Sequence, residues 1–118
     1  MLAGNRSHRV GDQILREISD LLLKKVKDPR LKGVTITDVS MSKDLRRAHV
    51  YYSIFGTEEQ KKQAGEGFES ATGYIRREIG ERLQLRYIPD IRFEYDTSLE
   101  YGQKMERILA NLNPEKDE

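Results

Sequence analysis

The sequence predicts a two-layer α+β domain in which helices cover one face of a three-stranded sheet. An amphipathic helix opens the chain, two short alternating segments follow it as a hairpin, and a long helical stretch precedes a third alternating segment. A three-stranded sheet cannot bury a face unless helices cover it, which favours two layers. Because the third strand follows a helical crossover, we expect a mixed sheet with one parallel pair.

Length and composition fit one domain. Of the 118 residues, 36% are hydrophobic and 35% are charged, and no apolar run approaches the ~20 residues that a membrane span needs. We expect residues 1–113 to form the domain and residues 114–118 to be a short, charged, disordered tail. The amino terminus lacks the pattern of a signal peptide, so we expect a cytoplasmic protein. We also expect it to be a monomer.

The first half of the chain predicts a helix from about Ser7 to Lys27, a turn and a hairpin. Pro29 ends the helix, and residues 28–33 form a turn that projects Arg30 and Lys32. The expected buried stripe of this helix is Val10, Ile14, Ile18, Leu21, Leu22 and Val26, with Leu15 at its margin.

Two alternating segments predict the antiparallel hairpin. The first strand runs over residues 34–41, and its alternation loses phase, which indicates a bulge near Thr37-Asp38. Residues 42–47 are a short loop, and the return strand runs over residues 48–55.

The second half predicts two helices joined at a bend, then a strand and a last helix. A capping box at residues 57–60 opens the first of these helices. The apolar stripe continues through the tripeptide Ala71-Thr72-Gly73, which we interpret as a kink. Residues 89–95 form the third strand, and a second capping box, Thr97 with Glu100, opens a helix that ends at Asn113-Pro114.

Gly73 allows two interpretations. If the helix breaks there, free N–H groups at the start of the second helix favour an anion, with Arg76 and Arg77 beside them. Alternatively, Gly73 only relieves a close contact between helix and sheet. The sequence leaves both open.

The net charge of +1 hides an uneven distribution. Residues 1–56 contain eleven Lys or Arg and six Asp or Glu, whereas residues 57–118 contain ten and fourteen. One basic half suits a polyanionic partner that is approached by one surface. Ordinary solvation of charged helices is the alternative explanation.

Residue types argue against an enzyme. The chain has no cysteine, and its two histidines, His8 and His49, fall on different elements without metal-ligand spacing. The carboxylates Asp90, Glu94 and Asp96 cluster near the last strand, where capping turns or pairing with arginine explains them. We therefore expect no catalytic residue, no cofactor and no metal.

The order helix, strand, strand, helix, kink, helix, strand resembles a type II KH-like domain with an added C-terminal helix. More narrowly, the chain resembles the ribosome-binding factor A family of bacteria. The resemblance covers nearly the whole length, and its motifs lie at residues 9–10, 28–31, 34–39, 42–45, 48–53, 71–76, 85–93 and 96–102. The family carries an Ala-x-Gly kink, matched by residues 71–73, in place of the Gly-x-x-Gly loop of KH domains.

This resemblance implies a non-catalytic assembly factor. It would bind free or immature small (30S) ribosomal subunits, contact their 16S rRNA and support maturation of the 5′ end of that rRNA, notably in the cold. The alternative is a protein-docking adaptor that acts on other assembly factors through the acidic face of residues 57–118.

We expect RNA to be held mostly through phosphates. The predicted RNA-binding residues come from the first helix and its turn, the hairpin and the kink: Arg6, Arg9, Arg16, Lys24, Lys27, Arg30, Lys32, Arg46, Arg47, Thr72, Gly73, Arg76 and Arg77. Base stacking on Tyr51, Tyr74, Tyr87 or Tyr101 is a weaker hypothesis, because aromatic rings more often pack in a core or at its rim.

Overall fold

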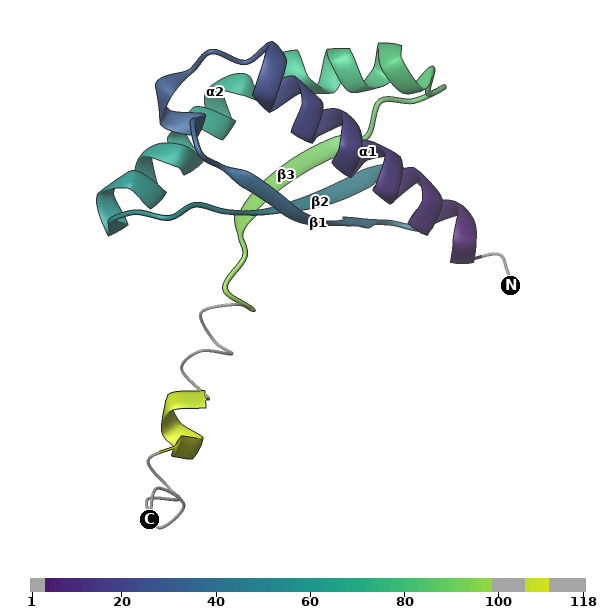
Figure 1. Ribbon diagram of the computed structural model, residues 1–118. Helices are drawn as coiled ribbons and strands as arrows, with labels where there is room; N and C mark the ends of the chain where they lie inside the picture. Colours follow the sequence, from purple (N-terminus) through teal and green to yellow (C-terminus); the bar gives the residue numbers. More distant parts are fainter. Residues whose placement is uncertain (1–3, 99–105, 111–118) are drawn as a thin grey trace.

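The computed structural model describes residues 4–98 and 106–110, and its elements follow the predicted order (Figure 1). They are α1 (Gly4–Lys24), the 3-10 helix η1 (Pro29–Leu31), β1 (Thr35–Met41), β2 (Arg47–Ser53), α2 (Glu58–Leu83) and β3 (Asp90–Tyr95). The sheet order is β1-β2-β3, with β2 antiparallel to β1 and parallel to β3. Figure 1 shows α1 and α2 on the same side of this sheet. The predicted α+β class and the mixed sheet are confirmed.

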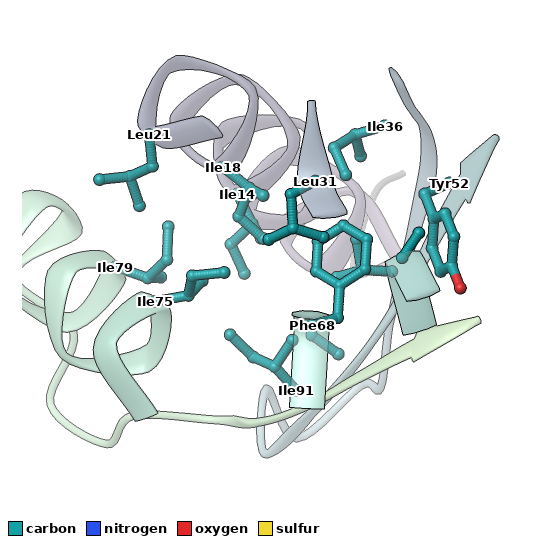
Figure 2. Close-up of a cluster of buried hydrophobic side chains, with 13 residues drawn as sticks. Ile14, Ile18, Leu21, Leu31, Ile36, Tyr52, Phe68, Ile75, Ile79 and Ile91 are labelled. Carbon is teal, nitrogen blue, oxygen red and sulfur yellow. The ribbon is translucent and has the colours of Figure 1, made fainter. Parts of the chain in front are cut away.

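The core lies between the two helices and the sheet (Figure 2). The stripe predicted for the first helix supplies Ile14, Ile18 and Leu21, all fully buried, and α2 supplies Phe68 and Ile75 opposite them. Burying each of these side chains contributes about 1.5–3 kcal/mol. From the sheet, the inward residues are Ile36, Ala48, Val50, Tyr52 and Ile91.

The first helix ends earlier than predicted. It stops at Lys24 rather than Lys27, and the N–H groups of Lys25 and Val26 both donate to the carbonyl of Leu21. Pro29 requires an extended residue before it, and Asp28 is extended, so the chain must leave the helix before it reaches the proline. The bulge predicted near Thr37-Asp38 is confirmed, since the pairing of β1 with β2 shifts between Ile36 and Asp38.

The predicted break at Gly73 is wrong, because α2 is one helix from Glu58 to Leu83. Figure 1 shows its two halves running in different directions, so the helix bends without breaking. Thr72 donates its hydroxyl hydrogen to the carbonyl of Phe68 at 2.7 Å, an arrangement that often bends helices. A Cβ added at Gly73 would meet nothing within 4 Å, so this glycine relieves no close contact either. The predicted bend is therefore present, but neither the free N–H groups nor the relief of a close contact explains Gly73.

The start of α2 is fixed as predicted. The hydroxyl of Thr57 accepts from the backbone N–H of Gln60 at 3.1 Å, and the Gln60 side chain accepts from the N–H of Thr57 at 2.7 Å. This reciprocal box satisfies two backbone donors that would otherwise lack a helical acceptor.

The last predicted helix is described only in part. Residues 106–110 are helical, with Ile108 40% and Leu109 54% exposed. The box between Thr97 and Glu100 extends outside the described residues, and the tail predicted at residues 114–118 lies wholly outside them.

Candidate nucleic-acid interface

The β1–β2 hairpin is a tightly bonded turn that presents basic side chains. Asp44 accepts a hydrogen bond from the hydroxyl of Ser42 at 2.7 Å and from the backbone N–H of Arg46 at 3.1 Å. These bonds, that from Ser42 first, hold the pKa of Asp44 below its usual value. Leu45 adopts a φ of 61°, and its N–H donates to the carbonyl of Ser42. The turn therefore fixes where Arg46 emerges.

The parallel pairing of β2 with β3 brings the loop before β3 beside this hairpin. Arg47 is paired with Asp90, and the N–H of Asp90 donates to the carbonyl of Arg46 at 2.9 Å. Tyr87, in the loop before β3, is 58% exposed, and its ring centroid lies 5.1 Å from the guanidinium carbon of Arg46. The guanidinium carbon of Arg86 lies 5.7 Å from the same centroid.

A pocket of about 290 Å³ opens at this place, and we call it the basic-end pocket. Three elements meet there: the start of α1, the hairpin and the loop after α2. Exposed cations come from each of them, namely Arg6, Lys43 and Arg86. Its other walls are Tyr87, Asp44 and the half-buried apolar residues Val10, Met41, Leu45 and Leu85.

Arg9 and Arg16, two of the predicted RNA-binding residues, lie exposed on α1. The helix also carries Glu17 and Asp20, but both carboxylates face α2, where Arg82 binds each of them at 2.9 Å. The hydrogen bond from Arg82 is the main cause that lowers the pKa of Asp20. Because α2 compensates these carboxylates, they do little to offset the field of Arg9 and Arg16.

The turn after α1 lies at the opposite end of β1 and contributes fewer free cations than predicted. Lys27 and Lys32 are exposed beside a hollow at the start of β1. Arg30, which was expected to project, instead binds Asp28 through Nη2 at 2.7 Å and through Nε at 3.1 Å. The geometry corrects that expectation, because the carboxylate of Asp28 caps η1 and holds the guanidinium in place.

The residues expected to act together at the kink do not converge on one point. The N–H groups of Thr72 and Gly73 lie inside the continuous helix α2, so the free donors that we expected for an anion are not there. Arg76 donates from Nε to the carbonyl of Pro89 at 3.0 Å and from Nη2 to that of Ile88 at 3.3 Å, which ties α2 to the loop before β3. Arg77 is exposed.

The structure thus divides the predicted residues into groups rather than one patch. Arg6 lines the basic-end pocket together with Tyr87, Arg46 lies over the ring of Tyr87, and Arg47 follows Arg46 at the start of β2. Lys27 and Lys32 lie at the other end of β1, and Lys24 binds Asp20 at 3.0 Å. Arg9 and Arg16 line α1 between the two ends.

Sequence reasoning missed Lys43 and Arg86. Both lie in loops that it had placed, at residues 42–47 and just before the third strand. The expected parallel pair of strands was the signal that could have found them. Parallel strands begin at the same edge of a sheet, so the loops before them lie together.

Other site types find no support in the described part of the chain. Within residues 4–98 and 106–110, no group of three or more His, Asp or Glu is placed to hold a metal ion. In the same residues, no helix has the length and apolarity to cross a membrane. The carboxylates near β3 have structural partners: Asp96 accepts from Thr37 at 2.6 Å, and Glu94 binds His49 at 2.6 Å.

Comparison with known proteins now identifies the family. The family model described as Ribosome-binding factor A matches residues 6–109. The chain belongs to the ribosome-binding factor A family. One relative, the ribosome-binding factor A of Caldanaerobacter subterraneus subsp. tengcongensis, is 52% identical over 112 residues, which cover 94% of this chain and 92% of the relative.

Solved structures of the ribosome-binding factor A family share the fold. The crystal structure of the factor from Thermus thermophilus is similar with a TM-score of 0.66 and 25% identity, over 75% of this chain and 94% of that one. A homology model of the Thermus thermophilus factor, fitted into the cryo-EM map of a 30S complex of that factor, gives a TM-score of 0.65 and 25% identity, over 78% and 96%.

Proposed function

We propose that the protein is a non-catalytic assembly factor that binds free or immature small (30S) ribosomal subunits through their 16S rRNA. The observation that carries this proposal is the convergence of Arg6, Lys43 and Arg86, from three separate segments, on one exposed pocket. Cations gathered from distant parts of a chain at one end of the molecule suit a polyanion, whose phosphates they neutralise while releasing counterions. Family membership and the Thermus thermophilus 30S complex support the ribosomal identity of that polyanion.

Within this proposal the predicted RNA-binding residues differ in availability. Arg6, Arg9, Arg16, Arg46 and Arg47 are exposed on α1 and the hairpin and can meet phosphates directly. At the bend and in the turn after α1, Arg76 and Arg30 already hold internal hydrogen bonds. The predicted residues there would therefore contribute less to RNA binding.

A binding measurement with two matched triple variants tests the proposal. Replacing Arg6, Lys43 and Arg86 with Gln removes three charges at the basic end; replacing Lys25, Lys27 and Lys32 with Gln removes three at the opposite end. The first variant should bind purified immature subunits at least about tenfold more weakly and reduce the log-log salt slope by about 2–3. The second should weaken binding clearly less, because Lys27 and Lys32 lie in or beside the turn after α1, where we expect weaker contacts. Equal losses, or a loss in the second variant alone, would contradict a basic-end interface.

Support for maturation of the 5′ end of the 16S rRNA, chiefly in the cold, is a further part of the proposal. Misfolded RNA helices escape more slowly when cold, so a protein that favours one RNA arrangement then has more effect. A strain without the protein should grow poorly and accumulate 5′-extended rRNA in the cold, with nearly normal growth when warm. Equal growth at both temperatures would count against a role in the cold.

The alternative, an adaptor for other assembly factors, draws on a different surface. The first half of α2 exposes Glu58, Glu59, Glu66 and Glu69, which suits a basic protein partner. Binding to naked 16S rRNA, compared with binding to the intact particle, separates the two functions. An adaptor would bind only particles that carry its protein partner.

A further inference from the structure

We infer that the basic-end pocket holds one unpaired RNA nucleotide, with its base against Tyr87 and its phosphate between the rim cations. This inference rests on the proposed function, because it names the part of the RNA that the proposed interface would recognise. It adds a preference for unpaired nucleotides that attraction to phosphates alone does not provide.

The lining of the pocket combines two chemistries that a nucleotide also combines. Arg6, Lys43 and Arg86 are exposed and can neutralise a phosphate. The half-buried apolar residues Met41 and Leu45 cannot bind a phosphate, but they suit the flat face of a base. At about 290 Å³ the pocket lies just below the ~300–1,000 Å³ typical of small-ligand sites. Its volume suits a single base.

Tyr87 is held as a stacking platform and is not packed away. Tyr87 is 58% exposed, and the guanidinium carbons of Arg46 and Arg86 lie over its ring, 5.1 Å and 5.7 Å from the ring centroid. Unpaired bases stack on aromatic rings and on guanidinium planes. Arg76 binds the carbonyls of the next two residues, Ile88 and Pro89, which fixes the backbone that carries the ring. A platform fixed in advance loses less entropy on binding.

Leu45 is a second sign that this pocket serves a ligand. Its φ of 61° lies in the left-handed region, where glycine or asparagine is the usual residue and a branched apolar residue is rare. The turn geometry does not by itself explain a leucine at this position. The leucine instead gives the pocket an apolar wall, and strained residues of this kind gather at functional sites.

A test compares two RNA probes and two variants. The probes are a nine-nucleotide RNA without self-complementarity and an RNA hairpin stem with the same number of phosphates, both at low salt. Tyr87→Leu removes the ring while keeping an apolar side chain, and Phe55→Leu is its control, because Phe55 is 97% exposed beyond the far end of β2. Leu45→Asn removes the apolar wall and suits the left-handed turn, so it should not unfold the protein.

Tyr87→Leu should weaken binding of the single strand about tenfold and leave binding of the stem within about twofold, because only an unpaired base can stack on the ring. Leu45→Asn should also weaken binding of the single strand, while the melting temperature of the protein is unchanged or higher. Phe55→Leu should alter neither probe. Equal weakening of both probes, no weakening of either, or no binding of the single strand by the unmodified chain would overturn the inference.

Failure of the pocket and failure of the proposed function give different results. If Tyr87→Leu leaves both probes unchanged while the Arg6, Lys43 and Arg86 triple variant still loses subunit binding, then phosphates carry recognition and the pocket does not. If the unmodified chain ignores immature subunits at low salt, the proposed function fails whatever the oligonucleotides do.

Discussion

The packing of two neighbouring side chains explains the glycine at position 67. Gly67 lies inside α2, where glycine is unfavourable by about 1 kcal/mol relative to alanine. A Cβ at this position would lie 3.0 Å from Cδ2 of Leu31 and 3.2 Å from Cβ of Arg30. Leu31 is buried and the Cβ of Arg30 is tied to the backbone of η1, so neither can move aside. The glycine lets η1 dock closely on α2.

We predict that Gly67→Ala destabilises the protein by about 1 kcal/mol, since overpacking costs about 1–3 kcal/mol and improved helix propensity offsets part of it. Gly73→Ala, in the same helix but with nothing within 4 Å of the added Cβ, is the control and should stabilise by about 0.5–1 kcal/mol. Urea denaturation measures both. The same sign for the two changes would show that the contact with Leu31 does not limit this position.

At the scale of the helices, an ion-pair cluster joins α1 to α2. Arg82 on α2 binds Glu17 and Asp20 of α1 at 2.9 Å each, and Glu78 lies 3.6 Å from its Nε. The two carboxylates raise the pKa of Arg82, so it stays charged at any pH at which the protein is folded. The cluster therefore depends on the protonation of the acids.

We predict that Asp20→Asn makes the stability of the protein depend less steeply on pH in the acid range. The pKa of Asp20 is lowered in the folded state, chiefly by the hydrogen bond from Arg82, so its contribution is present above the unfolded value near 3.8 and is lost as the pH falls through the folded value. Thermal melts from about pH 6 to pH 2 should fall less steeply in this variant. Asp12→Asn, exposed on the same helix, is the control. An unchanged slope in Asp20→Asn would mean that other carboxylates govern acid unfolding.

A second prediction about the helices concerns the capping box at the start of α2. Thr57→Ala leaves the N–H of Gln60 without its acceptor and should destabilise by about 1 kcal/mol. If the two hydrogen bonds are coupled, Gln60→Ala should lower the free energy of unfolding less in the Thr57→Ala variant than in the unmodified chain. A double-mutant cycle by urea denaturation measures this, and additive effects would contradict a reciprocal box.

Elements with local signals could be predicted from the sequence. The bulge in β1, the box at Thr57 and the buried stripe of α1 each depend on neighbouring residues only. The break at Gly73 could not be judged in this way, because a helix ends only where its hydrogen bonds find no acceptor, and around Gly73 they continue. Likewise, the roles of Arg30 and Arg76 depended on partners that only the packed turn and loop supply.

For the whole molecule, the fold determines which cations share a surface. Arg6 and Arg86 are eighty positions apart in the chain, yet the meeting of α1, the hairpin and the loop before β3 places them at one pocket. The sequence predicted that the first half of the chain is basic, but not at which end of the sheet its cations would lie. That choice follows from the parallel register, in which Arg47 is paired with Asp90.

We predict that affinity for small subunits falls steeply with salt. With about five phosphate contacts, the log of the association constant should fall against the log of the salt concentration with a slope of roughly −3 to −5. Binding measured between about 50 and 200 mM salt gives this slope. A flat response would contradict recognition through phosphates.

The parallel partnership of β2 and β3 also matters while the chain is being made. Because all of α2 separates the two strands, β2 emerges during translation well before the strand that completes its second edge. Until β3 arrives, that edge offers unpaired peptide groups and the nascent core lacks Ile91, and such long-range closure is slow. The nascent chain is therefore most prone to aggregate in the interval between completion of β2 and release of β3.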